Sequence, residues 1–409
     1  MSLIRISHPT GKLRGRLQLP GSKSESNRLL ILQALYTPEA QLKGLSTSKD
    51  TVVMRELLER YQNSDHLNVG DAGTAMRFLC AFLAQADGEW ILDGSARMRE
   101  RPIKVLVEAL RQLGAEIDYL GKEGFPPLKI KGQSLKGGRL RINAEVSSQY
   151  LSALMMVAPS LELGLEMKLE GHPVSMPYLQ LTGNLMRRMG FPVFILGDEI
   201  RIPAHQLSSP PKTLRVEPDW SAASYWFAMA LLSREAEIYL PGFQQYSLQG
   251  DSIVQQLMAP LGVEQVFIGG GIRIHKSKPF PIRKELNLIN TPDLAQSLIP
   301  IYAAFNQELQ FKGLQTLRIK ETDRIAALEN ELRKFQCELE SGDKHLSLQG
   351  GFKASEVRVA TYGDHRMAMG FAPLALLKPL EIENPEVVEK SYPGFWNDCE
   401  SLGFKLERL

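Results

Sequence analysis

The sequence has few cysteines and no long uninterrupted apolar run, and both absences restrict the kind of protein that it encodes. Its three cysteines, Cys80, Cys337 and Cys399, are widely separated and cannot all pair, which is typical of a reducing compartment. No segment holds about 18 consecutive apolar residues, and the N-terminus lacks the apolar core of a signal peptide. We therefore expect a cytoplasmic protein without a membrane partner.

Charge of one sign is not in excess either. The 48 lysines and arginines almost balance the 46 aspartates and glutamates, for a formal net charge of +2, which argues against nucleic acid as a partner. The chain has no C-x-x-C pattern, and its seven histidines show neither H-x-H nor H-x-x-x-H spacing, so we expect no metal site. Any cationic site must be local and suited to a small ligand.

Two common nucleotide-binding patterns are also missing. The stretch "LPGSKSESNR" (19–28) resembles a P-loop, but Ser22 separates Gly21 from Lys23, so the pattern G-x-x-x-x-G-K-[ST] fails and Ser22 is interpreted as a turn residue. The only run of three glycines, at 269–271, lacks the strand and helix that a dinucleotide-binding turn requires. Lys23 therefore needs a different anion.

What the chain does contain is a repeat. An amphipathic helical pattern followed by a one-residue break and a strand pattern recurs with its break at positions 114, 190, 262, 336 and 403, and the break residue is glycine in four of the five. Glycine is the residue that a helix C-terminus prefers at this position. The spacing of 67 to 76 residues indicates units of about one sixth of the chain.

A second pattern lies between these breaks. Small and polar residues precede an almost wholly apolar stretch of helical length in six places, which predicts six buried helices, marked by Arg28, Arg77, Tyr150, Tyr225, Ser297 and Arg366. We predict an α/β protein of six units in two domains of three, with the buried helices inside and the sheets outside. The first interval is short, and an ordinary open α/β sheet is the alternative.

The starts of the predicted buried helices carry charged and hydroxyl side chains. Helix N-termini favour anions, and arginine and lysine grip phosphate or carboxylate groups. Taken singly, most of these motifs are explained as well or better by a helix cap or a solvated helix start, whereas the charges of Asp364 and Arg366 beside a buried helix are less easily explained in that way. Their recurrence at corresponding places predicts a site for a small polyanion, in which Asp293 and Glu321 are the acid and base candidates.

These motifs resemble, in order and spacing, those of the 5-enolpyruvylshikimate-3-phosphate synthase family. They are "LPGSKSESNR", "GDAGTAMRFL", "RPIKVLVEALRQLGA", "SSQYLSALMM", "RIKETDRIAALENELRK" and "YGDHRMAMGFAPLAL". The resemblance implies two inside-out α/β barrels of three βαβαββ units each, at 22–217 and at 1–21 with 218–409, and a cleft between them that closes on substrate. It implies transfer of the enolpyruvyl group of phosphoenolpyruvate to the 5-hydroxyl of shikimate 3-phosphate, in the shikimate pathway, by a monomer without metal or organic cofactor.

The resemblance also implies a role for each matching residue. The shikimate 3-phosphate contacts are Lys23, Ser24, Arg28, Ser147, Ser148, Gln149, Ser175, Tyr178, Asp293 and Lys320. The phosphoenolpyruvate contacts are Lys23, Gly73, Arg77, Arg101, Gln149, Arg324, Arg366 and Lys390. Asp293 is the implied base on the 5-hydroxyl, and Glu321, together with Lys23, the implied proton donor to the methylene carbon.

The sequence departs from the family pattern in four places. Asp71 stands where asparagine is usual and would repel phosphoenolpyruvate unless it pairs with Arg77 or is protonated. Phe78 replaces a proline, and Thr316 replaces an asparagine near Lys320. The first unit is short, which predicts a trimmed strand or loop.

Two other functions fit parts of the pattern. The sister enzyme that transfers enolpyruvyl to UDP-N-acetylglucosamine resembles a protein with a cysteine in an arginine-bearing loop, whereas the stretch from Arg97 to Arg101 has none. A non-catalytic anion-binding relative would keep the arginines and lose Asp293 or Glu321, and both are present.

Overall fold

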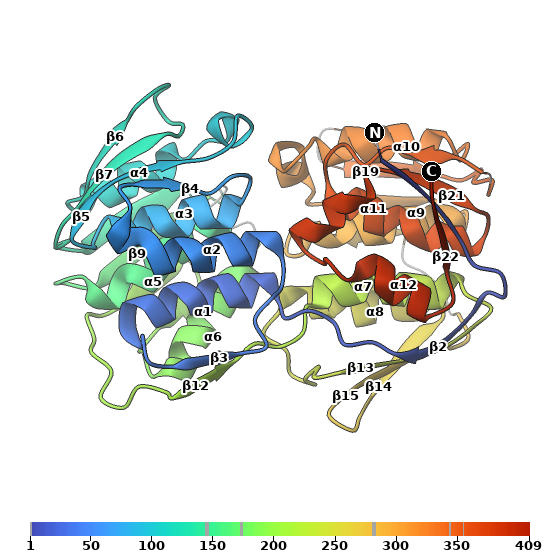
Figure 1. Ribbon diagram of the computed structural model, residues 1–409, viewed down its shortest axis with the longest axis horizontal. Coiled ribbons are helices and arrows are strands. Elements are labelled where there is room, and N and C mark those ends of the chain that lie inside the picture. The colour runs from blue at the N-terminus through green and yellow to red at the C-terminus, as the bar shows by residue number, and fades with distance from the viewer. Residues whose placement is uncertain (1, 144–146, 172–174, 280–283, 343–344, 355) are drawn as a thin grey trace. The chain divides into compact units, whose positions relative to one another are not determined.

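The protein is described by a computed structural model that covers residues 2–143, 147–171, 175–279, 284–342, 345–354 and 356–409. It forms two compact units (Figure 1), one of Gly21–Val216 and the other of Met1–Pro20 with Glu217–Leu409. Five of the six repeats contain a strand, a buried helix, a strand, an amphipathic helix and a strand pair, and the first has no strand pair among the described residues. This confirms the predicted six-unit α/β fold.

Three repeats make up Gly21–Val216. The first has β12 (Thr213–Arg215) parallel to β3 (Gln41–Lys43), with α1 (Lys23–Tyr36) and α2 (Lys49–Arg60). The second has strand order β4 (His66–Asn68), β5 (Gly88–Asp93), β7 (Leu128–Gly132), β6 (Glu116–Tyr119), with α3 (Gly73–Leu83) and α4 (Lys104–Gln112). The third has β8 (Gly138–Asn143), β9 (Leu165–Glu170), β11 (Glu199–Ile202), β10 (Phe194–Leu196), with α5 (Ser148–Val157) and α6 (Met176–Met189).

The other unit repeats the same strand order three times. The fourth sheet is β2 (Lys12–Arg16), β13 (Glu235–Pro241), β15 (Gly271–Lys276), β14 (Val263–Ile268), with α7 (Trp220–Leu232) and α8 (Val254–Met258). The fifth is β16 (Glu285–Asn287), β17 (Leu309–Lys312), β19 (His345–Gln349), β18 (Glu338–Ser341), with α9 (Ala295–Ala304) and α10 (Arg324–Arg333). The sixth is β20 (Arg358–Val359), β21 (Leu380–Glu383), β1 (Leu3–Ser7), β22 (Lys405–Arg408), with α11 (His365–Phe371) and α12 (Phe395–Ser401).

The N-terminal strands complete sheets of the second unit rather than the first. Strand β2 pairs in parallel with β13, and β1 lies between β21 and β22 with antiparallel pairing to both. The chain therefore starts and ends on neighbouring strands of one sheet. No additional strand completes the sheet of the first repeat, which in the described part of the chain has only β12 and β3. The trimming of a strand or loop that the short first interval predicted is therefore confirmed.

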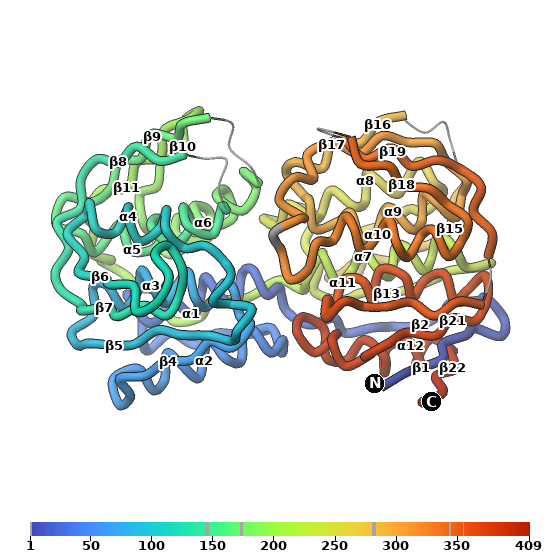
Figure 2. The backbone as a smooth tube through the Cα atoms, turned by 90° about the horizontal axis from the view of Figure 1, so that it is seen from above, coloured from blue at the N-terminus to red at the C-terminus, as the bar shows by residue number. Residues whose placement is uncertain are grey.

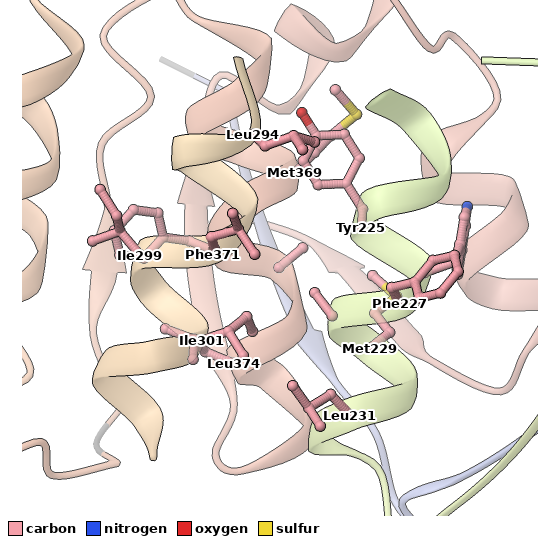
Figure 3. Close-up of a cluster of buried hydrophobic side chains, with 14 of the residues drawn as sticks. Tyr225, Phe227, Met229, Leu231, Leu294, Ile299, Ile301, Met369, Phe371 and Leu374 are labelled. Carbon is pink, nitrogen blue, oxygen red and sulfur yellow. The ribbon is translucent and has the colours of Figure 1, made fainter. Parts of the chain in front are cut away.

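The predicted buried helices form the centre of each unit, with strands around them (Figure 2). Helices α1, α3 and α5 contact one another, and α9 contacts both α7 and α11. In α7 every residue from Ala222 to Leu231 is buried, and Figure 3 shows Tyr225 of this helix beside Leu294 and Met369. Each fully buried large apolar side chain contributes roughly 1.5 to 3 kcal/mol, so this packing fixes where the helix N-termini lie.

The break residues have the backbone conformation that the repeat predicted. Gly114, Gly190, Gly262 and Gly403 have φ between 95° and 108°. Gln336, the one break residue that is not glycine, also has a positive φ, of 59°. A left-handed conformation costs a residue with a Cβ atom about 1 kcal/mol more than it costs glycine, so Gln336 is a site of backbone strain.

Gln336→Gly is expected to raise the free energy of unfolding by about 0.5 to 1 kcal/mol, because glycine relieves this strain. Gly190→Ala is the matched opposite: the added Cβ would lie 3.5 Å from Leu207 Cδ2, an ordinary contact, so a loss of about 1 kcal/mol would come from the backbone alone. Urea unfolding of both variants measures the effect. A destabilised Gln336→Gly protein would show that the Gln336 side chain contributes more than its conformation costs.

Candidate active site

The first motif folds into the start of α1. Ser22 is buried and its hydroxyl accepts a hydrogen bond from the Glu25 backbone N–H at 3.4 Å, so it is the N-cap of α1 rather than the turn residue that the sequence suggested. A serine in this place satisfies one of the free N–H groups of the helix start. Lys23 is the first residue of the helix, and its Nζ lies 3.3 Å from Asp50 Oδ2.

Arg28 lies one turn further along α1 and is almost fully buried. Its Nε donates to Thr182 Oγ1 at 2.7 Å, its Nη2 to Ser152 Oγ at 3.0 Å and its Nη1 to the Ser24 carbonyl at 2.8 Å. Burial lowers the pKa of Arg28 to about 10, which leaves the guanidinium charged at neutral pH. Three of the five N–H groups of the guanidinium are used by these neighbours.

Two aromatic rings lie near the same guanidinium. The centre of the Phe78 ring is 5.4 Å from Arg28 Cζ and that of Tyr178 is 5.9 Å away, within the range of cation–π interaction. Phe78 is fully buried in α3, which begins at Gly73. Phe78, which stands where the family usually has proline, therefore gives Arg28 an aromatic neighbour.

Gly73 and Arg101 approach each other closely. A Cβ atom at position 73 would lie 2.6 Å from Arg101 Nη1, so a larger residue here would displace the flexible end of the Arg101 side chain. The buried Arg77 side chain donates from Nη1 to the Gly73 carbonyl at 3.1 Å and from Nη2 to the Pro102 carbonyl at 3.2 Å. Burial, and then the charge of Arg101, lower the pKa of Arg77 to about 10.

Asp71, which stands where the family usually has asparagine, pairs with a serine rather than with Arg77. Its Oδ1 accepts a short hydrogen bond from the Ser95 hydroxyl. The Nη groups of Arg77 bond instead to backbone carbonyls and to Met98 Sδ, so the structure does not form the Asp71–Arg77 pair that would offset the carboxylate charge.

The starts of α5 and α6 carry the next group of predicted residues. Ser147 caps α5 and accepts from the Gln149 backbone N–H at 3.3 Å, Ser148 begins the helix, and Gln149 Nε2 donates to Thr74 Oγ1 of α3 at 3.1 Å. Ser175 precedes α6 with φ 60° and makes no capping hydrogen bond through its side chain. Strained backbone of this kind is concentrated at functional sites.

A different arrangement holds the predicted residues of the Glu217–Leu409 unit. Arg324 is 2% exposed and binds three carboxylates: Nε to Asp364 Oδ2 at 2.7 Å, Nη1 to Asp293 Oδ1 at 2.9 Å and Nη2 to Glu321 Oε2 at 2.9 Å. Burial alone would lower the pKa of this guanidinium, but the charges of Asp364, Glu321 and Asp293 outweigh it and raise the pKa. Arg324 thus fixes both predicted acid–base carboxylates.

Further cations surround these two carboxylates. Arg366 Nη2 lies 3.1 Å from Asp293 Oδ2, Lys320 Nζ 3.5 Å from Asp293 Oδ1 and Lys390 Nζ 3.7 Å from Glu321 Oε1. Burial would raise the pKa of Asp293, but Arg366, Lys320 and Arg324 together hold it well below its ordinary value. The unit gathers Asp293, Lys320, Glu321, Arg324, Arg366 and Lys390 in one network.

Comparison with known proteins identifies the family. The family model described as EPSP synthase (3-phosphoshikimate 1-carboxyvinyltransferase) matches residues 7–64 and 59–399. The chain belongs to the EPSP synthase family. A 3-phosphoshikimate 1-carboxyvinyltransferase of Bacteroides fragilis (strain YCH46) is 43% identical over 407 residues, which cover 98% of each chain. One of Histophilus somni is 36% identical over 428 residues, which cover 96% of this chain and 98% of that one.

Solved structures agree with this at the level of the fold. EPSP synthase from Acinetobacter baumannii, known at 2.37 Å, superimposes with a TM-score of 0.79 over the whole of both chains at 21% identity. Within the described residues, no three His, Cys, Asp or Glu side chains are grouped so as to hold a metal ion. Nor does any helix there have the length and apolarity needed to cross a membrane.

One buried group of this family member was missed by the sequence reading. Asp251, in the 3₁₀ helix η4 (Gly250–Ile253), is 5% exposed and accepts a short hydrogen bond from the Ser221 hydroxyl through Oδ2. Its Oδ1 is buried without a hydrogen-bond partner among the described residues. Burial, and then the charge of Asp293, raise the pKa of Asp251 to about 6. Thr316, another departure, likewise has a buried hydroxyl without such a partner in the described chain.

Asp251→Asn is expected to stabilise the protein at pH 7.5 by roughly 1 to 3 kcal/mol and to have little effect near pH 4. Because the pKa is raised in the folded state, the folded protein binds this proton more tightly than the unfolded chain, so stability falls as pH rises from about 4 through 6. The amide removes the charge and keeps an acceptor for Ser221. Urea unfolding at both pH values measures the difference; an equal effect at both would contradict the assigned titration.

Proposed function

We propose that this protein transfers the enolpyruvyl group of phosphoenolpyruvate to the 5-hydroxyl of shikimate 3-phosphate. The observation that carries the proposal is the pairing of Asp293 and Glu321 with one buried arginine and with separate lysines, in a chain whose whole length matches the EPSP synthase family. A base, an acid and cations for two phosphorylated substrates are the groups that this transfer needs.

In the proposed addition, Asp293 takes the proton of the 5-hydroxyl of shikimate 3-phosphate. The hydroxyl oxygen bonds to C2 of phosphoenolpyruvate in the same step. Glu321, with Lys23 as a second candidate, delivers a proton to the methylene carbon, which gives a tetrahedral ketal. In the elimination the same carbon loses a proton, the bond from C2 to the phosphate oxygen breaks, and phosphate leaves. Arg324, Arg366 and Lys390 offset the charge of the transferred group and the departing phosphate.

The low pKa of Asp293 has a consequence for this mechanism. A carboxylate stabilised by Arg366, Lys320 and Arg324 is a weak base. Substrate anions that share these cations would weaken their hold on the carboxylate and raise its basicity. Binding of both substrates would thereby prepare the base that the first step requires.

The residues that bind each substrate are assigned by resemblance to the family. For shikimate 3-phosphate we propose the hydroxyl and cationic groups of the Gly21–Val216 unit, which are Lys23, Ser24, Arg28, Ser147, Ser148, Gln149, Ser175 and Tyr178. For phosphoenolpyruvate we propose Gly73, Arg77 and Arg101 from that unit, with Arg324, Arg366 and Lys390 from the other. Because Arg77 is buried with its Nη groups on backbone carbonyls, its role is to support Gly73. We also propose a cytoplasmic monomer without cofactor.

The rival transfer to UDP-N-acetylglucosamine is not favoured. The loop that includes the 3₁₀ helix η2 (Met98–Glu100) has no cysteine. Cys80 is buried in α3, where burial raises its pKa to about 12, so its thiol is inert. Phosphate release from phosphoenolpyruvate is expected with shikimate 3-phosphate and not with UDP-N-acetylglucosamine; the reverse preference would refute the proposal.

A further inference from the structure

Glu331 is a buried carboxylate outside the predicted site. It lies in α10, is 0% exposed, and binds three groups. Its Oε2 accepts from the Ala360 backbone N–H at 3.1 Å and lies 2.7 Å from Lys334 Nζ, and its Oε1 accepts from the Tyr362 hydroxyl at 2.8 Å. Two of these three partners belong to the segment between β20 and α11.

That segment has a strained backbone. Tyr362 has φ 55° and Gly363 has φ 69°, both in the left-handed region. A tyrosine in this region costs about 1 kcal/mol or more and persists only where the surroundings hold it. The hydroxyl contact with Glu331 is such a hold, and burial and the Glu331 carboxylate raise the pKa of Tyr362 to about 12.

The same segment leads directly into the anion site. Asp364 follows Gly363, caps α11 by accepting from the Arg366 backbone N–H at 2.8 Å, and binds Arg324. Arg366 then reaches Asp293 with both Nη atoms, at 3.2 Å to its carbonyl and 3.1 Å to its carboxylate. The orientation of Arg366 therefore depends on where the segment 360–364 places the start of α11.

Helix α10 holds this segment at two points. Arg324 and Glu331 are seven residues apart, which puts them on one face of the helix, two turns and about 10 Å apart. Arg324 binds the end of the segment through Asp364, and Glu331 binds its beginning through Ala360 and Tyr362. One rigid helix thus spans a short strained connection at both ends.

We propose that Glu331 is a positioning residue for Arg366, and that through the segment 360–364 it sets the affinity of the enzyme for phosphoenolpyruvate. The proposal rests on the function proposed above. Glu331 itself touches no predicted substrate contact. A purely structural role would change stability, whereas a positioning role changes the KM for one substrate.

The test compares Glu331→Gln with Glu329→Gln. Glutamine at 331 removes the charge and offers one acceptor oxygen in place of two. Its NH₂ group faces either the Ala360 N–H, which then loses its hydrogen bond, or the Tyr362 hydroxyl, which must then accept instead of donate. Glu329 is on the same helix but accepts from the hydroxyl of Ser341, the last residue of β18, and not from the segment 360–364. The two variants make the same chemical change in the same helix.

For Glu331→Gln we expect the amides of 360–366 to exchange hydrogen about tenfold faster or more. We expect the KM for phosphoenolpyruvate to rise about tenfold while the KM for shikimate 3-phosphate changes by less than about twofold. Glu329→Gln should match the wild type in all three. Tyr362→Phe removes only the hydroxyl contact and should raise the KM for phosphoenolpyruvate by about threefold, which keeps the test available if Glu331→Gln fails to fold.

Three results would overturn the proposal: unchanged exchange of 360–366, faster exchange with an unchanged KM for phosphoenolpyruvate, or an equal rise of both KM values. Failure of the proposed function looks different. In that case wild type and Glu329→Gln would show no turnover with this substrate pair, and the exchange rates of 360–366 alone would decide whether Glu331 holds the segment.

Discussion

Arg324→Met is expected to lower the free energy of unfolding at pH 7 by about 3 to 5 kcal/mol. The reason is that Arg324 is the common partner of Asp364, Asp293 and Glu321, at 2.7 to 2.9 Å. Removing one member of a buried ionic network leaves the remaining charges buried and uncompensated. This destabilises the protein far more than replacing the whole network by apolar residues would. The measurement is urea unfolding of the variant against wild type.

The loss should also depend on pH. The pKa of Asp293 is held below its ordinary value, so the stability that this group contributes is present above about pH 4 and is lost on further acidification. Without Arg324 the Asp293 carboxylate loses one of the charges that hold its pKa low and takes up a proton more readily as pH falls. The difference between variant and wild type is therefore largest near pH 7 and shrinks toward pH 4.

Two control variants separate the buried network from charge in general. Arg139→Met breaks an exposed pair with Glu166, in which the arginine side chain is 87% exposed, and should cost less than about 1 kcal/mol. Arg324→Lys keeps the charge but lacks the fork that reaches three carboxylates and should fall between the two. An Arg324→Met protein as stable as Arg139→Met would contradict the assigned network.

Glu321→Gln is expected to lower kcat by about 10²- to 10⁴-fold, the range of general acid catalysis, with both KM values within about threefold of wild type. Glutamine has the shape of glutamate and can still accept from Arg324, which lies 2.9 Å from Glu321 Oε2. What it cannot do is deliver a proton to carbon. Steady-state kinetics with both substrates varied separates this loss from a loss of binding.

Asp323→Asn is the matched control, two residues further along the chain. Asp323 caps α10 by accepting from the Ile325 and Ala326 backbone N–H groups at 3.1 Å, and asparagine caps equally well. It should retain kcat within about twofold. Near-normal turnover of Glu321→Gln would remove Glu321 from the role of proton donor.

The fold was predictable from the sequence because its signals are periodic. Apolar stretches of helical length marked the six buried helices, and glycine at the helix ends marked four of the five breaks. Gln336 occupies the one break that has no glycine. The repeat still predicted a left-handed backbone at this position, and Gln336 has φ 59°. The motifs likewise included Lys320, Glu321, Arg324 and Arg366, and the start of the fifth apolar stretch included Asp293, whereas Lys390 was implied by the family resemblance alone.

What the sequence did not reveal depends on contacts between distant segments. Ser221 and Asp251 lie 30 positions apart and meet only when α7 and η4 pack. Glu331 resembles a surface glutamate paired with Lys334 three residues on, and its bonds to Ala360 and Tyr362 have no local signal. Ser22 was misread because a turn and an N-cap favour the same residue types.

Product stoichiometry tests most directly whether the protein couples phosphate release from phosphoenolpyruvate to ether formation on shikimate 3-phosphate. Wild-type protein would be incubated with phosphoenolpyruvate and shikimate 3-phosphate, and phosphate and the enolpyruvyl ether would be counted together by phosphate assay and mass spectrometry. We predict one molecule of 5-enolpyruvylshikimate 3-phosphate for each phosphate released, and no phosphate when shikimate 3-phosphate is omitted. Phosphate released without the ether, or an ether formed only on UDP-N-acetylglucosamine, would contradict the account.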